Sequence, residues 1–202
     1  MNVDRDKSEL LLLLTRKSVC RGTFILASGA TSDLYVDAKL TTLNPRGAVL
    51  VGRAGWHLIK ERTARRGVRV DAVGGLTMGA DAIALSIGIA AHLEDSASAV
   101  QTFTVRKSPK AHGRNKLIEG NFVTGNSVVV IDDVITTGGS TLQAIDAVEA
   151  EGGRVAFVLV LVDRQEGGRE KIEARGHQVV SIFTRAEVLA AGVPERSDPG
   201  AA

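Results

Sequence analysis

Two adjacent carboxylates stand in the middle of the chain, at the end of a short apolar run. The run, residues 128–131, contains only β-branched residues and predicts a strand buried on both faces of a parallel sheet. Asp132 and Asp133 follow it directly. Ligands of such sheets lie beyond the carboxyl ends of the strands. We therefore expect both aspartates to lie beside a bound ligand.

A loop of hydroxyl and glycine residues follows the aspartates and leads into a helix predicted over 140–151. The backbone N–H groups and hydroxyls of such a loop, together with the positive end of a helix, favour a phosphate. The two carboxylates would repel a phosphate, so sugar hydroxyls or a magnesium-bound group suit them better. The pattern predicts a ligand with both a phosphate and a sugar diol, and the alternative is a solvated turn with two exposed acids. The residues assigned to the ligand are Asp132, Asp133, Val134, Ile135, Thr136, Thr137, Gly138, Gly139 and Ser140.

A second cluster, within residues 106–120, is rich in basic side chains. Five lysines and arginines and one histidine lie within a dozen residues that follow a predicted strand. A basic loop is most often only a solvated surface. The phosphate-binding pattern elsewhere in the chain favours a cationic loop for a polyphosphate instead.

The alternation of apolar strands and amphipathic helices predicts the scaffold that positions these residues. It indicates an α/β fold with a central, mostly parallel sheet flanked by helices. A long helix is predicted to begin at Asn44 and Pro45, and an earlier one to be capped by Ser8. The predicted strands cover residues 23–26, 34–37, 70–73, 99–105, 128–131, 155–162 and 179–183.

Composition excludes several classes of protein. The chain has 202 residues, 44% of them hydrophobic, and a net charge of +2, which is typical of a globular domain. A single cysteine, Cys20, excludes an intrachain disulfide or a cysteine cluster for a metal. No apolar stretch approaches the roughly 18 residues of a membrane helix. We expect a cytoplasmic protein that binds neither membranes nor nucleic acids, because neither the charge nor the 3% aromatic content favours nucleic acid.

The strand, the acid pair and the loop together resemble the ribose 5-phosphate signature of the type I phosphoribosyltransferases. The resemblance implies that Asp132 and Asp133 serve the ribose of phosphoribosyl pyrophosphate (PRPP), while residues 136–141 bind its 5-phosphate. It also implies a type I phosphoribosyltransferase fold with a small N-terminal hood over about residues 1–40, to which the last strand is a candidate addition. The single domain is then expected over 1–193, with a flexible tail over 194–202. Magnesium is the implied cofactor, held mainly by PRPP and not by a metal site of the protein.

The motifs taken together resemble the orotate phosphoribosyltransferases. They are FILASG at 24–29 with SDLYVD at 32–37, RKSPKAHG at 106–113, DDVITTGGS at 132–140 and VDRQE at 162–166. The resemblance implies that Arg106, Lys107, Lys110 and His112 bind pyrophosphate and take part in catalysis with the two aspartates. It also implies a homodimer in which Lys107 acts in the neighbouring subunit's site. Thr136 and Arg164 are the implied orotate ligands, and a planar guanidinium suits the carboxylate of orotate.

Two positions depart from this family's pattern. Many members carry a lysine where Ala27 stands, and another in the loop where this chain has Met78. Lys39 is our candidate for replacing the missing cations.

The implied reaction transfers ribose 5-phosphate from PRPP to orotate, giving orotidine 5′-monophosphate and pyrophosphate, a step of pyrimidine (UMP) synthesis. One alternative is a phosphoribosyltransferase for a purine base, which would share the phosphate loop but not the acceptor pocket. Another is a PRPP-sensing regulator that binds nucleic acid. Arg164 and the basic loop favour orotate over a purine base. The regulator would need an added nucleic-acid-binding element, which the near-neutral charge and the 3% aromatic content do not favour.

Overall fold

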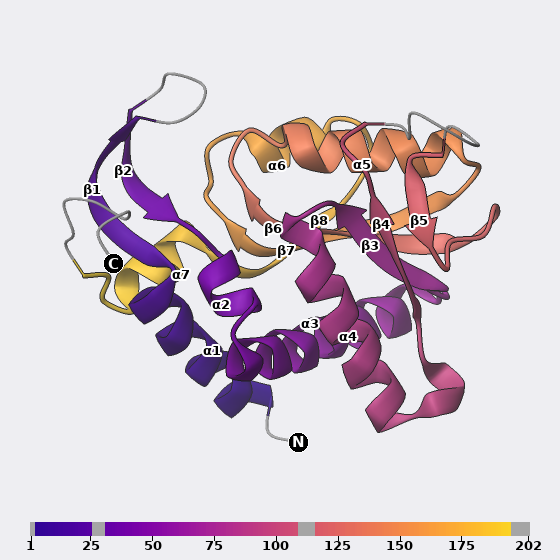
Figure 1. Ribbon diagram of the computed structural model, residues 1–202, viewed down its shortest axis with the longest axis horizontal. Coiled ribbons are helices and arrows are strands. Elements are labelled where there is room, and N and C mark those ends of the chain that lie inside the picture. The colour runs from indigo at the N-terminus through magenta and orange to yellow at the C-terminus, as the bar shows by residue number, and fades with distance from the viewer. Residues whose placement is uncertain (1–2, 26–30, 109–115, 195–202) are drawn as a thin grey trace.

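The computed structural model describes residues 3–25, 31–108 and 116–194, and its centre is a six-stranded sheet (Figure 1). The strand order is β5-β4-β3-β6-β7-β8. Neighbouring strands are parallel, except that β5 runs antiparallel to β4. The predicted α/β fold with a mostly parallel sheet is therefore confirmed. The strands are β3 (Ala72–Leu76), β4 (Gln101–Val105), β5 (Ile118–Gly120), β6 (Ser127–Ile135), β7 (Arg154–Asp163) and β8 (Val179–Thr184).

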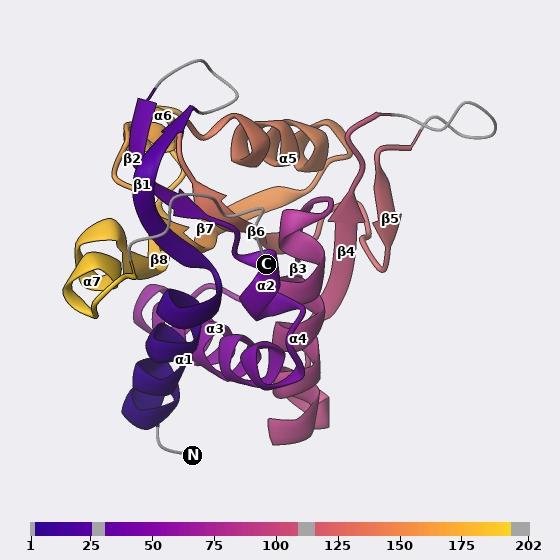
Figure 2. The ribbon, with the colours of Figure 1, turned by 60° about the vertical axis from the view of Figure 1, so that its left-hand side comes forward.

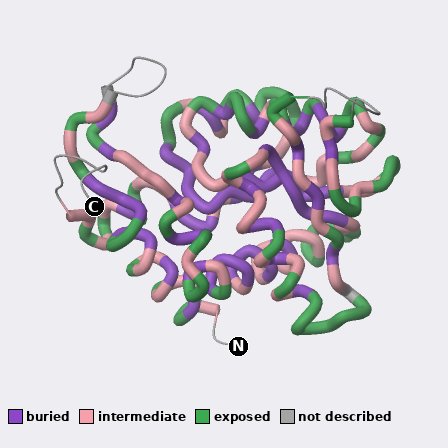
Figure 3. Tube along the Cα trace, viewed as in Figure 1, coloured by how far each residue is buried: buried purple, intermediate pink, exposed green. Residues whose placement is uncertain are grey.

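Helices cover both faces of this sheet. α3 (Pro45–Arg66) and α4 (Gly79–Glu94) lie on one face, and α5 (Gly139–Ala150) and α6 (Gly168–Glu173) on the other (Figure 1). Successive side chains of a strand point to opposite faces. Val129 of β6 accordingly packs in the core beneath α3 and α4, whereas Val130 packs in the core beneath α5 and α6. The strands of the sheet are the most continuously buried part of the chain (Figure 3).

The N-terminal part of the chain forms a helix and a separate hairpin. The helix α1 (Val3–Lys17) packs on α3, and β1 (Val19–Ile25) pairs antiparallel with β2 (Thr31–Val36). The short helix α2 (Lys39–Thr42) connects this hairpin to α3. Figure 2 shows the hairpin standing apart from the six-stranded sheet, near the last helix, α7 (Arg185–Ala190). We refer to α1, β1 and β2 as the hood.

Two expectations about the hood are wrong. The last strand, β8, pairs with β7 and so belongs to the main sheet. Ser8 lies inside α1 and does not cap it, because its hydroxyl donates a hydrogen bond to the carbonyl oxygen of Asp4 one turn earlier. The cap of the long helix is as predicted: the side chain of Asn44 accepts hydrogen bonds from the N–H groups of Arg46 and Gly47.

The structure also corrects the limits of two predicted elements. The strand expected to end at residue 73 runs through Gly74 and Gly75, because β4 pairs with both glycines and β6 pairs with Gly74. The stretch 106–120, expected to be a polar loop throughout, ends in the strand β5. No helix within the described ranges is long and apolar enough to cross a membrane.

Candidate functional site

The acid pair lies inside β6, near its carboxyl end, and not beyond it. Asp132 shares the face of Val130 and points toward α5, where its Oδ2 accepts a hydrogen bond of 2.5 Å from the hydroxyl of Thr141. Its Oδ1 accepts a second hydrogen bond, of 3.0 Å, from the N–H of Asp133. Asp132 is 6% exposed. Burial raises the pKa of this carboxyl to about 7, although the hydroxyl of Thr141 opposes the shift.

Asp133 points to the opposite face of the strand, toward the start of α4. Its Oδ1 accepts a hydrogen bond of 2.9 Å from the N–H of Val134, and the residue is only half-buried. A Cβ atom at Gly79 would lie 2.6 Å from the same oxygen, so a side chain on the first residue of α4 would displace the carboxylate of Asp133. The strand thus turns one carboxylate into the protein and leaves the other beside a helix N-terminus.

Val134 and Ile135 complete β6, and their side chains serve the core. Val134 packs with the core under α3 and α4, and Ile135 is buried in the core under α5 and α6. What these two residues can offer a ligand is therefore their backbone.

The loop after β6 leads directly into the first turn of α5. Gly138 has a φ of 80°, and a Cβ atom there would lie 2.9 Å from the carbonyl oxygen of Gly168. Both the left-handed backbone and the close approach of α6 require glycine at this position. Thr137, Gly139 and Ser140 are exposed, whereas Thr136 is half-buried. Because the first N–H groups of a helix have no partner within it, this turn can bind an anion.

The loop between β3 and α4 faces the loop after β6 from the neighbouring strand. The carboxylate of Asp81 accepts a hydrogen bond of 2.6 Å from Thr77 and another from Thr104. The N–H of Thr77 also donates to the carbonyl oxygen of Val105, and the Thr77–Met78 peptide bond is cis. Asp81 therefore holds this loop. From β3 the chain runs through α4 to β4 on one side of β3, and it later returns to the other side as β6. Ligands of open α/β sheets bind at such a reversal of strand order.

Arg106 and Lys107 begin the basic loop after β4. The N–H of Arg106 donates to the carbonyl oxygen of Leu117, and its Nη1 lies 4.0 Å from Oε1 of Glu119. The side chain of Lys107 is exposed, and its carbonyl oxygen accepts a hydrogen bond from Gln143 of α5. The structure thus places the start of the basic loop beside the helix that follows the phosphate-binding pattern. Lys110 and His112 lie outside the described residues.

Arg164 follows β7, which is the next strand beyond β6. Its N–H donates to the carbonyl oxygen of Ile135, so the backbone of Arg164 lies beside the start of the loop that contains Thr136. The residue is 4% exposed. Its Nη2 lies 2.5 Å from the hydroxyl of Ser32 and 2.7 Å from Oε1 of Glu166. Sequence reasoning had not assigned a role to Ser32 or Glu166, although both stand within the motifs it used.

Lys39 lies close to the acid pair, whereas Met78 points into solvent. The Nζ of Lys39 is 2.6 Å from Oδ1 of Asp37, and Met78 is 69% exposed. The hydrogen bond to Asp37 raises the pKa of Lys39, with a smaller contribution from the charge of Asp133. Ala27 lies outside the described residues.

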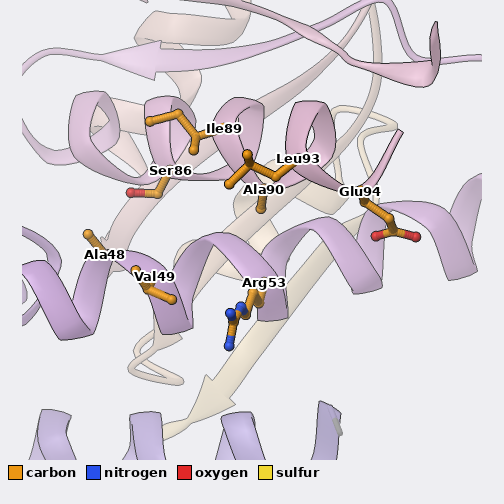
Figure 4. A pocket seen from close by; sticks show the side chains of 8 residues that line it. All are labelled: Ala48, Val49, Arg53, Ser86, Ile89, Ala90, Leu93 and Glu94. Carbon is orange, nitrogen blue, oxygen red and sulfur yellow. The ribbon is translucent and has the colours of Figure 1, made fainter. Parts of the chain in front are cut away.

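A groove between α3 and α4 contains none of the predicted site residues (Figure 4). Its volume is about 400 Å³, and most of its lining side chains are apolar. Val49 of α3 and Ile89 and Leu93 of α4 are 44%, 51% and 79% exposed there. The lining residues are Ala48, Val49, Arg53, Ser86, Ile89, Ala90, Leu93 and Glu94.

No group of three or more histidine, cysteine, aspartate or glutamate side chains is placed to hold a metal ion in the part of the chain that the structure describes.

Comparison with known proteins connects this geometry to a family. Residues 77–189 match the phosphoribosyl transferase domain. The chain is 39% identical over 183 residues to an orotate phosphoribosyltransferase of Rhodopirellula baltica, covering 91% of this chain and 94% of the relative. It is 43% identical to the orotate phosphoribosyltransferase of Mycobacterium tuberculosis, covering 91% and 96%. A crystal structure of the M. tuberculosis enzyme in complex with PRPP matches with a TM-score of 0.72 at 39% identity, covering 91% of this chain and 98% of that one.

The matched domain spans the β3–α4 loop, the basic loop, the acid pair and Arg164, and the relatives match nearly the whole length of the chain. The chain therefore belongs to the phosphoribosyltransferase family, and within it to the orotate phosphoribosyltransferases.

Proposed function

We propose that the protein transfers ribose 5-phosphate from PRPP to orotate, which yields orotidine 5′-monophosphate and pyrophosphate for UMP synthesis. The observation that carries the proposal is a convergence at the carboxyl ends of β3, β6 and β7. A helix N-terminus for phosphate, an acid pair and a buried arginine meet there. Cys20, the single cysteine of the chain, is buried, which suits the reducing cytoplasm that we expect for this enzyme.

The 5-phosphate of PRPP is assigned to the loop after β6. Thr136, Thr137, Gly138, Gly139 and Ser140 would surround it with N–H groups and hydroxyls. The half-buried Asp133 would accept hydrogen bonds from the ribose hydroxyls, and the buried Asp132 would hold Thr141 and thereby the first turn of α5. Both carboxylates would also stabilise the positive charge that grows on the ribose as its anomeric C–O bond breaks.

The leaving pyrophosphate is assigned to the cations of the basic loop, Arg106, Lys107, Lys110 and His112. When bound with PRPP, magnesium neutralises part of the pyrophosphate charge. The acid pair fits an ion carried in this way, since one carboxylate remains half-exposed near the ribose position. Closure of the basic loop would exclude water, which otherwise competes with the base for the ribose.

Orotate is assigned to Thr136 and Arg164, at the ends of β6 and β7. Orotate carries a carboxylate that the other pyrimidine bases lack, and a guanidinium is the side chain best matched to it. Burial of Arg164 strengthens the attraction because fewer water molecules screen it. The ring nitrogen of orotate needs little activation, since the negative charge of its anion is delocalised into the ring carbonyl groups.

A homodimer is part of this proposal, with the partner's Lys107 completing each site. We place its interface on the groove between α3 and α4. Symmetric dimers bring the same patch of both subunits together, so the patch must be complementary to itself. The groove is compatible with this condition, because its exposed side chains are mostly apolar, and its two charged residues, Arg53 and Glu94, are already paired within the subunit with Asp6 and Lys60 (Figure 4).

The decisive assay follows the ultraviolet absorbance of orotate on addition of enzyme, magnesium and PRPP. A loss of absorbance that needs both PRPP and magnesium supports the proposal. Adenine, guanine and hypoxanthine form the comparison panel, and turnover of one of these in place of orotate would overturn the assignment of the base. A gel-shift with and without PRPP tests the regulator alternative, for which we expect no shifted nucleic acid.

A further inference from the structure

The hood reaches the buried arginine of the main sheet through a closed set of hydrogen bonds. Arg164 Nη2 donates to the hydroxyl oxygen of Ser32 at 2.5 Å and to the carbonyl oxygen of Leu34 at 3.0 Å. The hydroxyl of Ser32 donates to the same carbonyl oxygen at 2.9 Å, and the N–H of Leu34 donates back to the hydroxyl at 3.2 Å. Two residues of β2 therefore hold one nitrogen of the guanidinium.

The hydroxyl of Ser32 has no freedom to turn away. A serine hydroxyl can donate one hydrogen bond and accept two. At Ser32 all three are in use, and the residue is 7% exposed. Both the direction of its lone pair and its distance to Arg164 are consequently set by the backbone of β2.

The charge of Arg164 is balanced by a different residue. Oε1 of Glu166 lies 2.7 Å from the same Nη2, and the side chain of Glu166 is 30% exposed. Because this carboxylate supplies the counter-charge, the neutral hydroxyl of Ser32 contributes direction and not charge. The two contributions can be separated by substitution.

The guanidinium keeps donors from which no described residue accepts a hydrogen bond. The Nε of Arg164 is buried and has no hydrogen-bond partner among the described residues. A buried N–H group without a partner is costly, and a ligand acceptor would remove that cost. Among the described residues, only Nη2 is held, so the N–H groups of Nε and Nη1 are the donors left for a ligand.

We propose that Ser32 is a positioning residue for the base: it fixes the plane of the Arg164 guanidinium so that the donors not held by the hood meet the carboxylate of orotate. This inference rests on the proposed function, which assigns the base to Arg164. It makes the hood a part of acceptor recognition, through a contact that joins residues 132 positions apart in the chain.

The test compares two ligands that differ only in the carboxylate, orotidine 5′-monophosphate and uridine 5′-monophosphate. Their dissociation constants are measured by calorimetry for the wild type, Ser32→Ala and Ser32→Thr. We expect Ser32→Ala to reduce the preference for orotidine 5′-monophosphate about tenfold, the effect of losing one hydrogen bond to a charged group. The affinity for uridine 5′-monophosphate should stay within about twofold of that of the wild type, because this ligand lacks the carboxylate that Arg164 is proposed to bind. Ser32→Thr keeps the hydroxyl and should restore the preference.

Ser8→Ala is the matched control, since Ser8 is exposed and its hydroxyl bonds only within α1. It should leave both constants unchanged. If Ser32→Ala does not fold, Ser32→Cys replaces it, with nearly the same shape and a weaker hydrogen bond. Steady-state kinetics gives a second readout: the KM for orotate should rise while the KM for PRPP does not.

The outcomes separate the inference from the function beneath it. A wild-type protein that binds both nucleotides equally would overturn the assignment of the base to Arg164. A wild type that prefers orotidine 5′-monophosphate, with the preference intact in Ser32→Ala and Ser32→Cys, would overturn the role of Ser32 alone.

Discussion

The two neighbouring aspartates of β6 have different surroundings because successive residues of a strand face opposite ways. Asp132 is held by Thr141 inside the protein, and Asp133 lies beside Gly79 at the start of α4. The sequence indicated that both carboxylates belong to the site. It could not assign them to opposite faces, because the strand was expected to end before them and in fact continues through both.

Asp132 makes the stability of the unliganded protein depend on pH. Its carboxyl has a pKa of about 7 in the folded protein, against an ordinary value of 3.8, because burial disfavours its charged form. A carboxyl with a raised folded-state pKa contributes stability that is complete below the unfolded pKa and is lost as the pH rises through the folded one. The Tm of Asp132→Asn minus that of the wild type should therefore increase as the pH rises from about 4 to 7, and should stay constant above that.

Thermal unfolding at a series of pH values measures this difference. Asp146→Asn is the control, because Asp146 is exposed and paired with Arg175 at the surface. Its Tm difference from the wild type should stay nearly constant over the same range. A constant difference for Asp132→Asn as well would contradict the raised pKa.

Lys39 is expected to supply a cation that Ala27 and Met78 do not. It lies beside Asp37 and close enough to Asp133 for that carboxylate to contribute to its raised pKa. Lys39→Ala should raise the KM for orotate or lower turnover by about tenfold, or ~1.4 kcal/mol. Lys39→Arg keeps the charge and should retain most of the activity, whereas Lys171→Ala, on α6, should have no effect. Unchanged kinetics in Lys39→Ala would exclude this role.

Among the elements, those with strong local signals were predicted best. The Asn44 cap, the proline after it and the apolar spacing of the next residues fixed the start of α3 correctly. β5 was missed because its three residues have no alternating pattern, and only the exposed edge of β4 makes them a strand. β3 was placed too early because its two glycines resemble a turn in sequence, although pairing of both with β4, and of Gly74 with β6, keeps them in the sheet.

The loop after β4 carries the clearest prediction at the level of elements. Lys107→Ala should lower turnover far more than PRPP binding, because the negative charge that Lys107 is proposed to stabilise grows only as pyrophosphate leaves. An equal mixture of Lys107→Ala and Asp133→Asn should regain about a quarter of the wild-type activity. Half of the randomly formed dimers are hybrids, and each hybrid has one intact site of its two. The measurement is the initial rate after the two variants are unfolded and refolded together. Activity no greater than the sum of the separate variants would show that Lys107 acts within its own subunit.

At the scale of the whole molecule, the apolar groove between α3 and α4 is the expected contact between subunits. Leu93→Asp, at the most exposed apolar position of the groove, should convert dimers to monomers because it places two carboxylates in one symmetric contact. Sedimentation velocity measures the change in mass. The monomer should also lose activity if the partner's Lys107 completes the site.

Leu85→Asp is the matched control for that experiment. Leu85 is 56% exposed on the same helix but does not line the groove. It should leave the dimer intact. Dimers that persist in Leu93→Asp, or that dissociate equally in Leu85→Asp, would place the interface elsewhere.

The contact between Ser32 and Arg164 also bears on how the enzyme is made. A ribosome releases the hood first, then the strands that carry the phosphate loop, and Arg164 only after about four-fifths of the chain. The phosphate loop must wait as well, because β7 pairs with β6 and the backbone of Gly168 packs against Gly138. A domain folds as a unit, so the complete site, including its means to choose the acceptor, exists only once the chain beyond Arg164 has been made.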